Sequence, residues 1–249
     1  MTEVVAVKDL NKKTMKSKLI FVFCLFFLSL NAQKNIHHRW NQMLNKYVSE
    51  NGQVNYKAWM FEQDNLDAYI RTLEGFHPKK KDSKNQKLAF WINLHNALTV
   101  QLILKKYPIK SINNINGLWE IKCFSSLNKE YTLGDIKNKL LRKMNEPRIH
   151  FAINFTSKSG PRLLNQAFQE RNLENQLRQI TNDFLKDSTK NKISSNQLKL
   201  SEIFKRFEND FGTKDQIYNF IQTYTGVSLN VPKINYLVYN WDLNELNSF

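Results

Sequence analysis

A histidine and two serines lie close together near the middle of the chain. His150 is flanked by apolar residues in RIHFAIN, which predicts a part-buried imidazole. Such a histidine can act as base, acid or metal ligand, because modest shifts move its pKa across neutrality. Ser157 and Ser159 follow within nine residues, so a serine–histidine nucleophile pair is one interpretation. In the structural interpretation, the imidazole satisfies a backbone group and the serines only shape a loop.

The same loop has features that suit a bound anion. Asn154 opens it, and Arg162 follows Gly160 and Pro161 at its end. Hydroxyls and backbone amides beside a forked guanidinium can form an anion-binding concavity. No nucleophile elbow surrounds the serines. A catalytic site would therefore use His150 with the serines, whereas Asn154 and Arg162 would bind a ligand.

Two asparagines lie in the most apolar stretch of the chain, LAFWINLHNALTVQLIL. Its helix is apolar on nearly every side, which predicts burial on most faces. Asn93 and Asn96 share one face of it, and Trp91 is adjacent. An unsatisfied buried amide costs about 1–3 kcal/mol, so both need partners. We expect Asn93 or Asn96 to contact the backbone of residues 154–157; direct ligand contact by Trp91 and the two asparagines is the alternative.

Signals for metals and cofactors are weak. His37 and His38 lack nearby cysteine or carboxylate ligands. The sequence contains neither a His-Glu-x-x-His helix nor an aspartate-rich calcium loop, and it has no glycine-rich phosphate loop. We therefore predict neither a metal site nor a cofactor.

Four motifs with regular spacing resemble one known family. They are FWINLHNALT at 90–99, YPIKSI at 107–112, PRIHFAINFTSKSGP at 147–161 and YNWDLN at 239–244. With LSEIFKRFENDFG at 200–212, the chain resembles the domain of unknown function 547 (DUF547) family over roughly residues 40–245. The resemblance implies a fold and a site, but no settled reaction.

The chain departs from that family at two positions. Members similar to it typically carry a cysteine after the asparagine of the third motif and often a second before the proline, where this chain has Phe155 and Gly160. A cysteine near a histidine can become a thiolate nucleophile, but phenylalanine cannot. We expect Phe155 to fill space near His150.

The elements that must position these residues are mainly helical. Helices are predicted over 35–49, 57–73, 133–144, 172–185 and 215–224, and another begins at Ser201. The central apolar helix has Asp82 or Ser83 as its N-cap and stops before Pro108. Hairpins are predicted over 121–132 and 192–200, and a terminal strand over 234–241. Seven glycines, five prolines and two cysteines argue against a turn-rich all-β protein and a disulfide scaffold. The sequence therefore predicts a mainly helical α+β single domain with small hairpins and a buried central helix.

The first 32 residues have the pattern of an export signal. Two lysines precede an apolar run of 12 residues from Leu19 to Leu30, which is too short to span a bilayer. A basic start, a short apolar core and a small residue near its end are typical of a signal peptide. We expect residues 1–14 to precede the true start, 15–32 to be the signal and 33–249 the exported domain, periplasmic or extracellular. An uncleaved membrane anchor is the alternative.

The chain is strongly basic. Removing five basic and two acidic residues with the signal from totals of 37 and 22 leaves 32 and 20, a net charge of +12. An exported protein rarely meets nucleic acid, so this charge favours solubility or anionic envelope polymers as partners. Three hypotheses remain: a non-catalytic binding or scaffold domain with a decayed site, a hydrolase or transferase, and a basic polymer-binding protein.

We predict that the mature protein begins at Gln33, because Ala32 is the small residue that a signal peptidase would leave before the cut. N-terminal sequencing of the protein from its native host measures this. A chain that retains residues 19–30 in the membrane fraction would show an anchor instead.

Overall fold

The computed structural model describes residues 36–230 and 233–246. The chain divides into a unit that ends at Ile36 and a compact unit that begins at His37. The predicted start, signal peptide and cleavage position therefore lie outside the described residues. The second unit is mainly helical with two small sheets, which confirms the α+β prediction.

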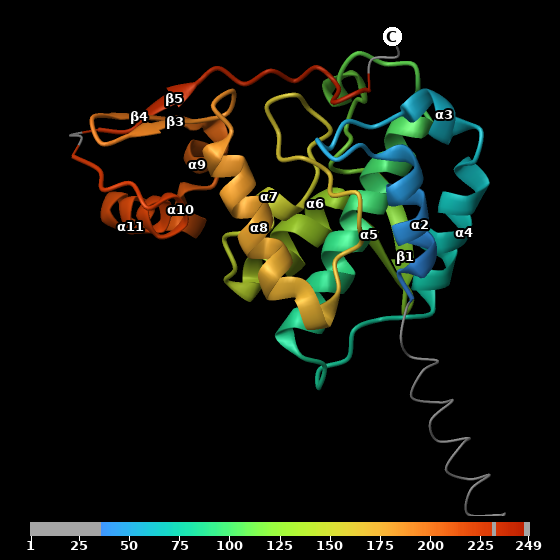
Figure 1. Cartoon of the computed structure of the whole chain (residues 1–249). Coiled ribbons are helices and arrows are strands. Elements are labelled where there is room, and N and C mark those ends of the chain that lie inside the picture. The colour runs from blue at the N-terminus through green and yellow to red at the C-terminus, as the bar shows by residue number, and fades with distance from the viewer. Residues whose placement is uncertain (1–35, 231–232, 247–249) are drawn as a thin grey trace, which may run out of the picture. The chain divides into compact units, whose positions relative to one another are not determined.

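A long buried helix, α5 (Lys84–Leu104), forms the centre of this unit. Ser83 is its N-cap and accepts a hydrogen bond from the Gln86 amide. Every residue from Leu88 to Leu104 is buried, because α4, α8 and η2 pack around it. Figure 1 shows α5 between α8 and α4. Among the described residues, no helix combines the length and apolarity needed to cross a bilayer.

The helix predicted over 57–73 is wrong, because two helices occupy this stretch. The elements here are α2 (His38–Tyr47), α3 (Tyr56–Met60) and α4 (Gln63–Glu74). The chain turns at Phe61, whose side chain is 79% exposed, and the Glu62 amide donates to the Trp59 carbonyl. The turn lets α3 and α4 each direct an apolar face to the core.

The predicted first hairpin and the helix after it are present. Strands β1 (Lys122–Ser126) and β2 (Lys129–Thr132) pair through a turn at Leu127 and Asn128, both with positive φ. A capping box between Thr132 and Asp135 then begins a helical run. That run consists of α6 (Leu133–Asp135), the π-helical η2 (Ile136–Leu141) and η3 (Arg142–Met144).

The C-terminal half places helices beside a three-stranded sheet. Its elements are α7 (Ile149–Ala152), η4 (Glu170–Asn172), α8 (Leu173–Lys186), β3 (Lys192–Ser194), β4 (Gln197–Ser201), α9 (Glu202–Arg206), α10 (Glu208–Phe211), α11 (Lys214–Thr225) and β5 (Asn235–Leu237). Strand β4 pairs antiparallel with β3 and parallel with β5. Figure 1 shows β3, β4 and β5 with α9, α10 and α11 on the far side of α8 from α2 and α4.

The strand predicted over 234–241 is too long, since β5 ends at Leu237. The residues beyond it cross back to the N-terminal half as an extended segment (Figure 1). Single bridges pair this C-terminal segment, residues 238–246, with three separate loops; they are Ser157 with Leu243, Ser111 with Asp242 and Val54 with Glu245. The η1 turn (Ile112–Asn114) follows the second of these loops. The alternation in the sequence therefore reflects loop contacts rather than one sheet.

Candidate functional site

The side-chain amides of α5 hold two irregular segments against the helix. Asn96 donates to the Ala152 carbonyl at 3.0 Å and accepts from the Asn154 amide at 2.8 Å. Asn93 makes the same pair of bonds with the backbone of Phe168, at 2.8 and 2.9 Å. All of these groups are buried. Asn96 thus has the expected contact with the start of the 154–157 segment, whereas Asn93 holds a different loop.

The two serines contact the C-terminal segment. The Ser157 hydroxyl lies 2.7 Å from the hydroxyl of Tyr239, and Ser159 Oγ accepts from the Asn240 amide at 2.9 Å. Ser157 is buried, and burial raises the pKa of Tyr239 to about 12. Neither hydroxyl has a hydrogen bond to His150 among the described residues. The geometry therefore provides no serine–histidine pair.

The packing around Gly160 explains the absence of a larger residue there. A Cβ built at this position would lie 2.7 Å from Ser157 Oγ and 3.1 Å from the Tyr239 hydroxyl. Contacts under 3.0 Å require one of the groups to move. A cysteine at position 160 would therefore disturb the bond between Ser157 and Tyr239.

His150 lies in α7 and bonds to a residue 60 positions away. Its side chain is fully buried, and Nε2 lies 2.7 Å from Oδ2 of Asp210 in α10. Arg142 donates to the same carboxylate from Nε, which is 2.6 Å from Oδ2, and from Nη2, which is 2.8 Å from Oδ1. The ring of Phe207 stacks on the imidazole at 4.0 Å. Three segments thus converge on one ionic group.

Burial keeps the imidazole neutral. It lowers the pKa of His150 to about 4, although the bond to Asp210 acts in the opposite direction. Burial alone would raise the pKa of Asp210, but the bonds from Arg142 and His150 bring it below its ordinary value. A neutral imidazole beside a carboxylate carries its proton on Nε2. Nδ1 is then an acceptor, and it has no hydrogen-bond partner among the described residues.

Lys137 of η2 covers this cluster with a cation. Its Nζ lies 4.4 Å from the ring centre of Trp119, 5.3 Å from that of Phe207 and 5.6 Å from that of Phe155. Such contacts stabilise a cation through the ring quadrupole. Burial, with the nearby charge of Arg142, lowers the pKa of Lys137 to about 8. Lys137 makes no hydrogen bond or ion pair with any described residue.

Phe155 fills the space expected of it. Its side chain is 5% exposed, and its ring lies 6.3 Å from Phe207, which in turn stacks on His150. The aromatic ring therefore occupies the place where the family resemblance puts a thiol. A ring at this position supplies packing and a cation contact, but no nucleophile.

The other predicted site residues lie in different surroundings. Trp91 is buried against the rings of His77 and Tyr131. Arg162 donates to the Glu50 carbonyl and pairs with Asp183, beside a cleft of about 230 Å³ on α8. Neither has a described contact with the cluster around His150, so the eight candidate residues do not form one site.

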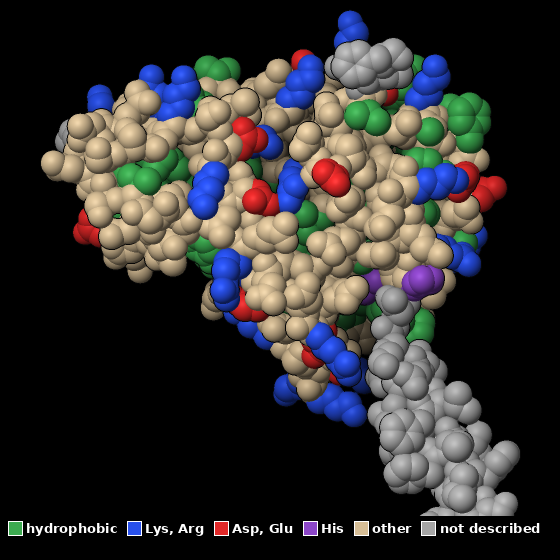
Figure 2. All heavy atoms as spheres, viewed as in Figure 1, with side chains coloured by type: hydrophobic (Ala, Val, Ile, Leu, Met, Phe, Trp, Pro, Cys, Tyr) green, Lys and Arg blue, Asp and Glu red, His purple; other side chains and the backbone are tan. Residues whose placement is uncertain are grey.

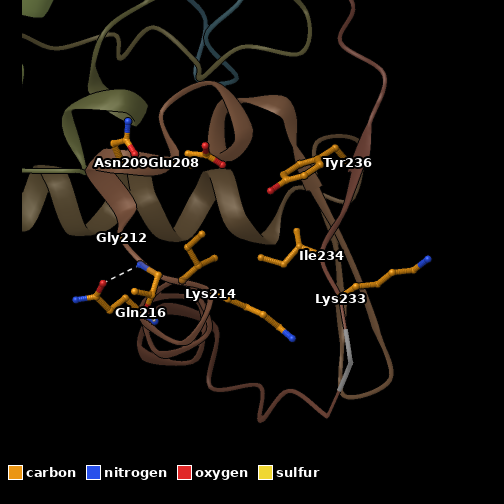
Figure 3. A pocket seen from close by; sticks show the side chains of 10 residues that line it. Glu208, Asn209, Gly212, Lys214, Gln216, Lys233, Ile234 and Tyr236 are labelled. Atoms are coloured by element: carbon orange, nitrogen blue, oxygen red, sulfur yellow. Dashed lines mark hydrogen bonds between the residues drawn. The ribbon is translucent and has the colours of Figure 1, made fainter.

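A second cavity, of about 590 Å³, lies between the start of α11 and the approach to β5 (Figure 3). Lys214, Lys233 and Tyr236 are among its lining residues. A capping box closes the start of α11, in which the Gln216 amide donates to Thr213 Oγ1 and the Thr213 amide donates to Gln216 Oε1. No predicted site residue lines this cavity.

The remaining thiol and the metal-binding groups offer little chemistry. Cys123 is the cysteine of the described residues, and burial raises the pKa of its thiol to about 11. A thiol with a raised pKa is a poor nucleophile. In the described part of the chain, no three His, Cys, Asp or Glu side chains are grouped to hold a metal ion.

Sequence reasoning missed Asp210, which bonds to His150, and the neighbouring cations Arg142 and Lys137. These three residues lie on short helices, where a charged residue resembles any solvated surface residue. Asp210 lies within the LSEIFKRFENDFG stretch, which is the one signal that could have drawn attention to it.

Comparison with known proteins agrees with the motifs at 90–99, 107–112 and 147–161. Residues 79–185 match the model of the family described as Protein of unknown function, DUF547. The chain resembles the DUF547 family. The DUF547 match includes α5, Lys137, His150 and Phe155, whereas Asp210 and the C-terminal segment lie outside it. No curated protein and no solved structure matches the chain.

Replacing Asn96 with alanine should lower the free energy of unfolding by about 1–3 kcal/mol or more, because the mutation leaves a buried amide and a buried carbonyl unpaired. Asn209→Ala, at an exposed position, is the control. Urea unfolding measures both. Equal effects of the two mutations would show that the amide does not hold the segment that follows α7.

Acid should destabilise the protein between pH 6.5 and about 4. Burial lowers the pKa of His37, His95 and His150 to about 4, 3 and 4, so each stays neutral when folded while the unfolded chain takes up protons near 6.5. Stability is therefore lost as pH falls through this window. His150→Gln keeps an N–H donor for Asp210 and should reduce the slope of unfolding free energy against pH by about one proton. An unchanged slope would contradict the neutral state of His150.

Proposed function

We propose that the chain is an exported, non-catalytic binding domain with a decayed site. The observation that carries the proposal is the state of His150. Asp210 orients its imidazole as a general base is oriented, yet Nδ1 meets neither a thiol nor a hydroxyl among the described residues. Phe155 occupies the position of the family's thiol and is buried under Lys137.

The contacts of the two serines weaken the alternative of a serine hydrolase. A nucleophilic serine needs its base within about 2.6–3.2 Å. Ser157 instead bonds to Tyr239, and Ser159 accepts from the backbone of Asn240. These hydroxyls connect the loop at residues 157–159 to the C-terminal segment by hydrogen bonds, so their role is structural.

A basic polymer-binding protein is the second alternative, and the net charge of +12 after signal removal favours it. Figure 2 shows lysine and arginine side chains scattered over the viewed face, with acidic groups between them. Scattered charge gives weak, salt-sensitive attraction rather than a shaped site. We therefore prefer binding at the His150 cluster, with the surface charge as an aid to solubility.

The proposal predicts no turnover that depends on His150. The wild type and His150→Ala should hydrolyse p-nitrophenyl acetate and an unfolded peptide at the same background rate. A wild-type rate that exceeds that of the variant, with both proteins folded by circular dichroism, would establish an enzyme.

Phe155→Cys tests the decayed site directly, as a second arm of this experiment. Lys137 lies 5.6 Å from the Phe155 ring, so its charge should lower the pKa of the introduced thiol, while burial at this position raises it. Iodoacetamide labelling of the peptide that contains position 155, followed by mass spectrometry across pH, measures that pKa. Adding Lys137→Met should raise this pKa, because it removes the cation and leaves the effect of burial; equal pKa values in both variants would count against a former thiol site.

A further inference from the structure

Lys137 is a cation without an acidic partner in a half-buried position. Three aromatic rings surround its ammonium, and it has no hydrogen bond or ion pair within the described part of the chain. Aromatic faces attract a cation but accept no strong hydrogen bond from it. The three N–H groups of Lys137 are therefore available to a ligand.

The charges near Lys137 leave one positive charge uncompensated. Arg142 is neutralised by Asp210, and Arg206 by Glu202 at 2.8 Å. Both arginines act on Lys137 strongly enough to affect its ionisation. With two carboxylates for three cations, the cluster has a net charge of +1 and matches a ligand of single negative charge.

We propose that Lys137 binds the carboxylate of a small monoanion whose apolar body packs on the partly exposed rings of Trp119 and Phe207. The proposal rests on the binding function proposed above and names its ligand class. Trp119 and Phe207 are neither buried nor fully exposed, so ring surface remains for a ligand. A ligand that combines a carboxylate with an apolar body would use both features of the site.

The charge balance argues for a carboxylate over a phosphate dianion. Arg142 donates Nε and Nη2 to Asp210 and Nη1 to Asn138, and Arg206 donates Nη2 to Glu202. Each arginine charge is therefore paired with a carboxylate, and Lys137 carries the remaining positive charge. One lysine with a net charge of +1 suits a monoanion better than a dianion.

Binding should weaken as pH rises from 7 to 9. Lys137, with a pKa of about 8, loses its charge in this range. Arg142 keeps its proton because the bond to Asp210 raises its pKa, and the imidazoles of His150 and His95 are already neutral because burial lowers their pKa to about 4 and about 3. Lys137 is thus the titrating group of the cluster at these pH values.

The experiment titrates the full chain with benzoate, its neutral analogue benzamide and the dianion phenyl phosphate, following tryptophan fluorescence and calorimetry. We expect benzoate to bind and benzamide to bind at least roughly tenfold more weakly, since one charge-assisted hydrogen bond contributes about 1.5–3 kcal/mol. We expect phenyl phosphate to bind more weakly than benzoate, because a dianion exceeds the single positive charge of the site. Phenyl phosphate binding as tight as benzoate would overturn the carboxylate assignment. Absence of benzoate binding would overturn the inference.

Three variants locate the site. Lys137→Met should weaken benzoate binding by roughly tenfold or more, whereas Lys143→Met, an exposed lysine on the adjoining turn, should not. Lys137→Arg keeps the positive charge, so its affinity for benzoate should not fall between pH 7 and 9. This variant tests the site if Lys137→Met fails to fold. Unchanged affinity in folded Lys137→Met overturns the site. Benzoate binding at Lys137 together with turnover dependent on His150 supports the site and overturns only the non-catalytic function.

Discussion

The side-chain amide of Asn96 forms two hydrogen bonds with the backbone of the segment that carries His150, as a neighbouring strand would. Helix α5 is apolar on all sides, so it must be buried, and a buried helix cannot leave its amides unpaired. Asn96 meets this requirement by bonding to the backbone on both sides of Ile153, where α7 ends and the chain becomes extended. The direction in which the chain enters the candidate site is therefore set by α5.

The same requirement links distant parts of the chain. His150 is buried by this arrangement and needs a partner, which Asp210 supplies; Asp210 in turn is a charge that needs Arg142. The loop after Asn154 is held from its other side by the C-terminal segment, through Leu243 and Tyr239. Each buried polar group needs a hydrogen-bond or ionic partner, and that partner comes from another element. These elements therefore depend on one another for their positions.

Local patterns predicted the elements whose causes are local. The apolar run with Ser83 as a cap identified α5, and the Thr132–Asp135 spacing identified the start of the helical run after the hairpin. The contact of Asn96 could also be predicted, because burial leaves an amide few alternatives. The break at Phe61 and the early end of β5 were missed, since both depend on packing between segments far apart in the sequence. Asp210 and Lys137 were missed for the same reason: a charged residue on a short helix reveals its partner only after folding.

The two departures from the family pattern are physically connected. Phe155 adds a ring that packs against Phe207 and lies under Lys137. Gly160 removes a side chain and leaves room for Ser157 to bond to Tyr239. A thiolate at the first position would lie beside the ammonium of Lys137, whereas the phenylalanine gives Lys137 a ring and leaves it without an anion among the described residues. The carboxylate that we propose as a ligand would supply the negative charge that such a thiolate would carry.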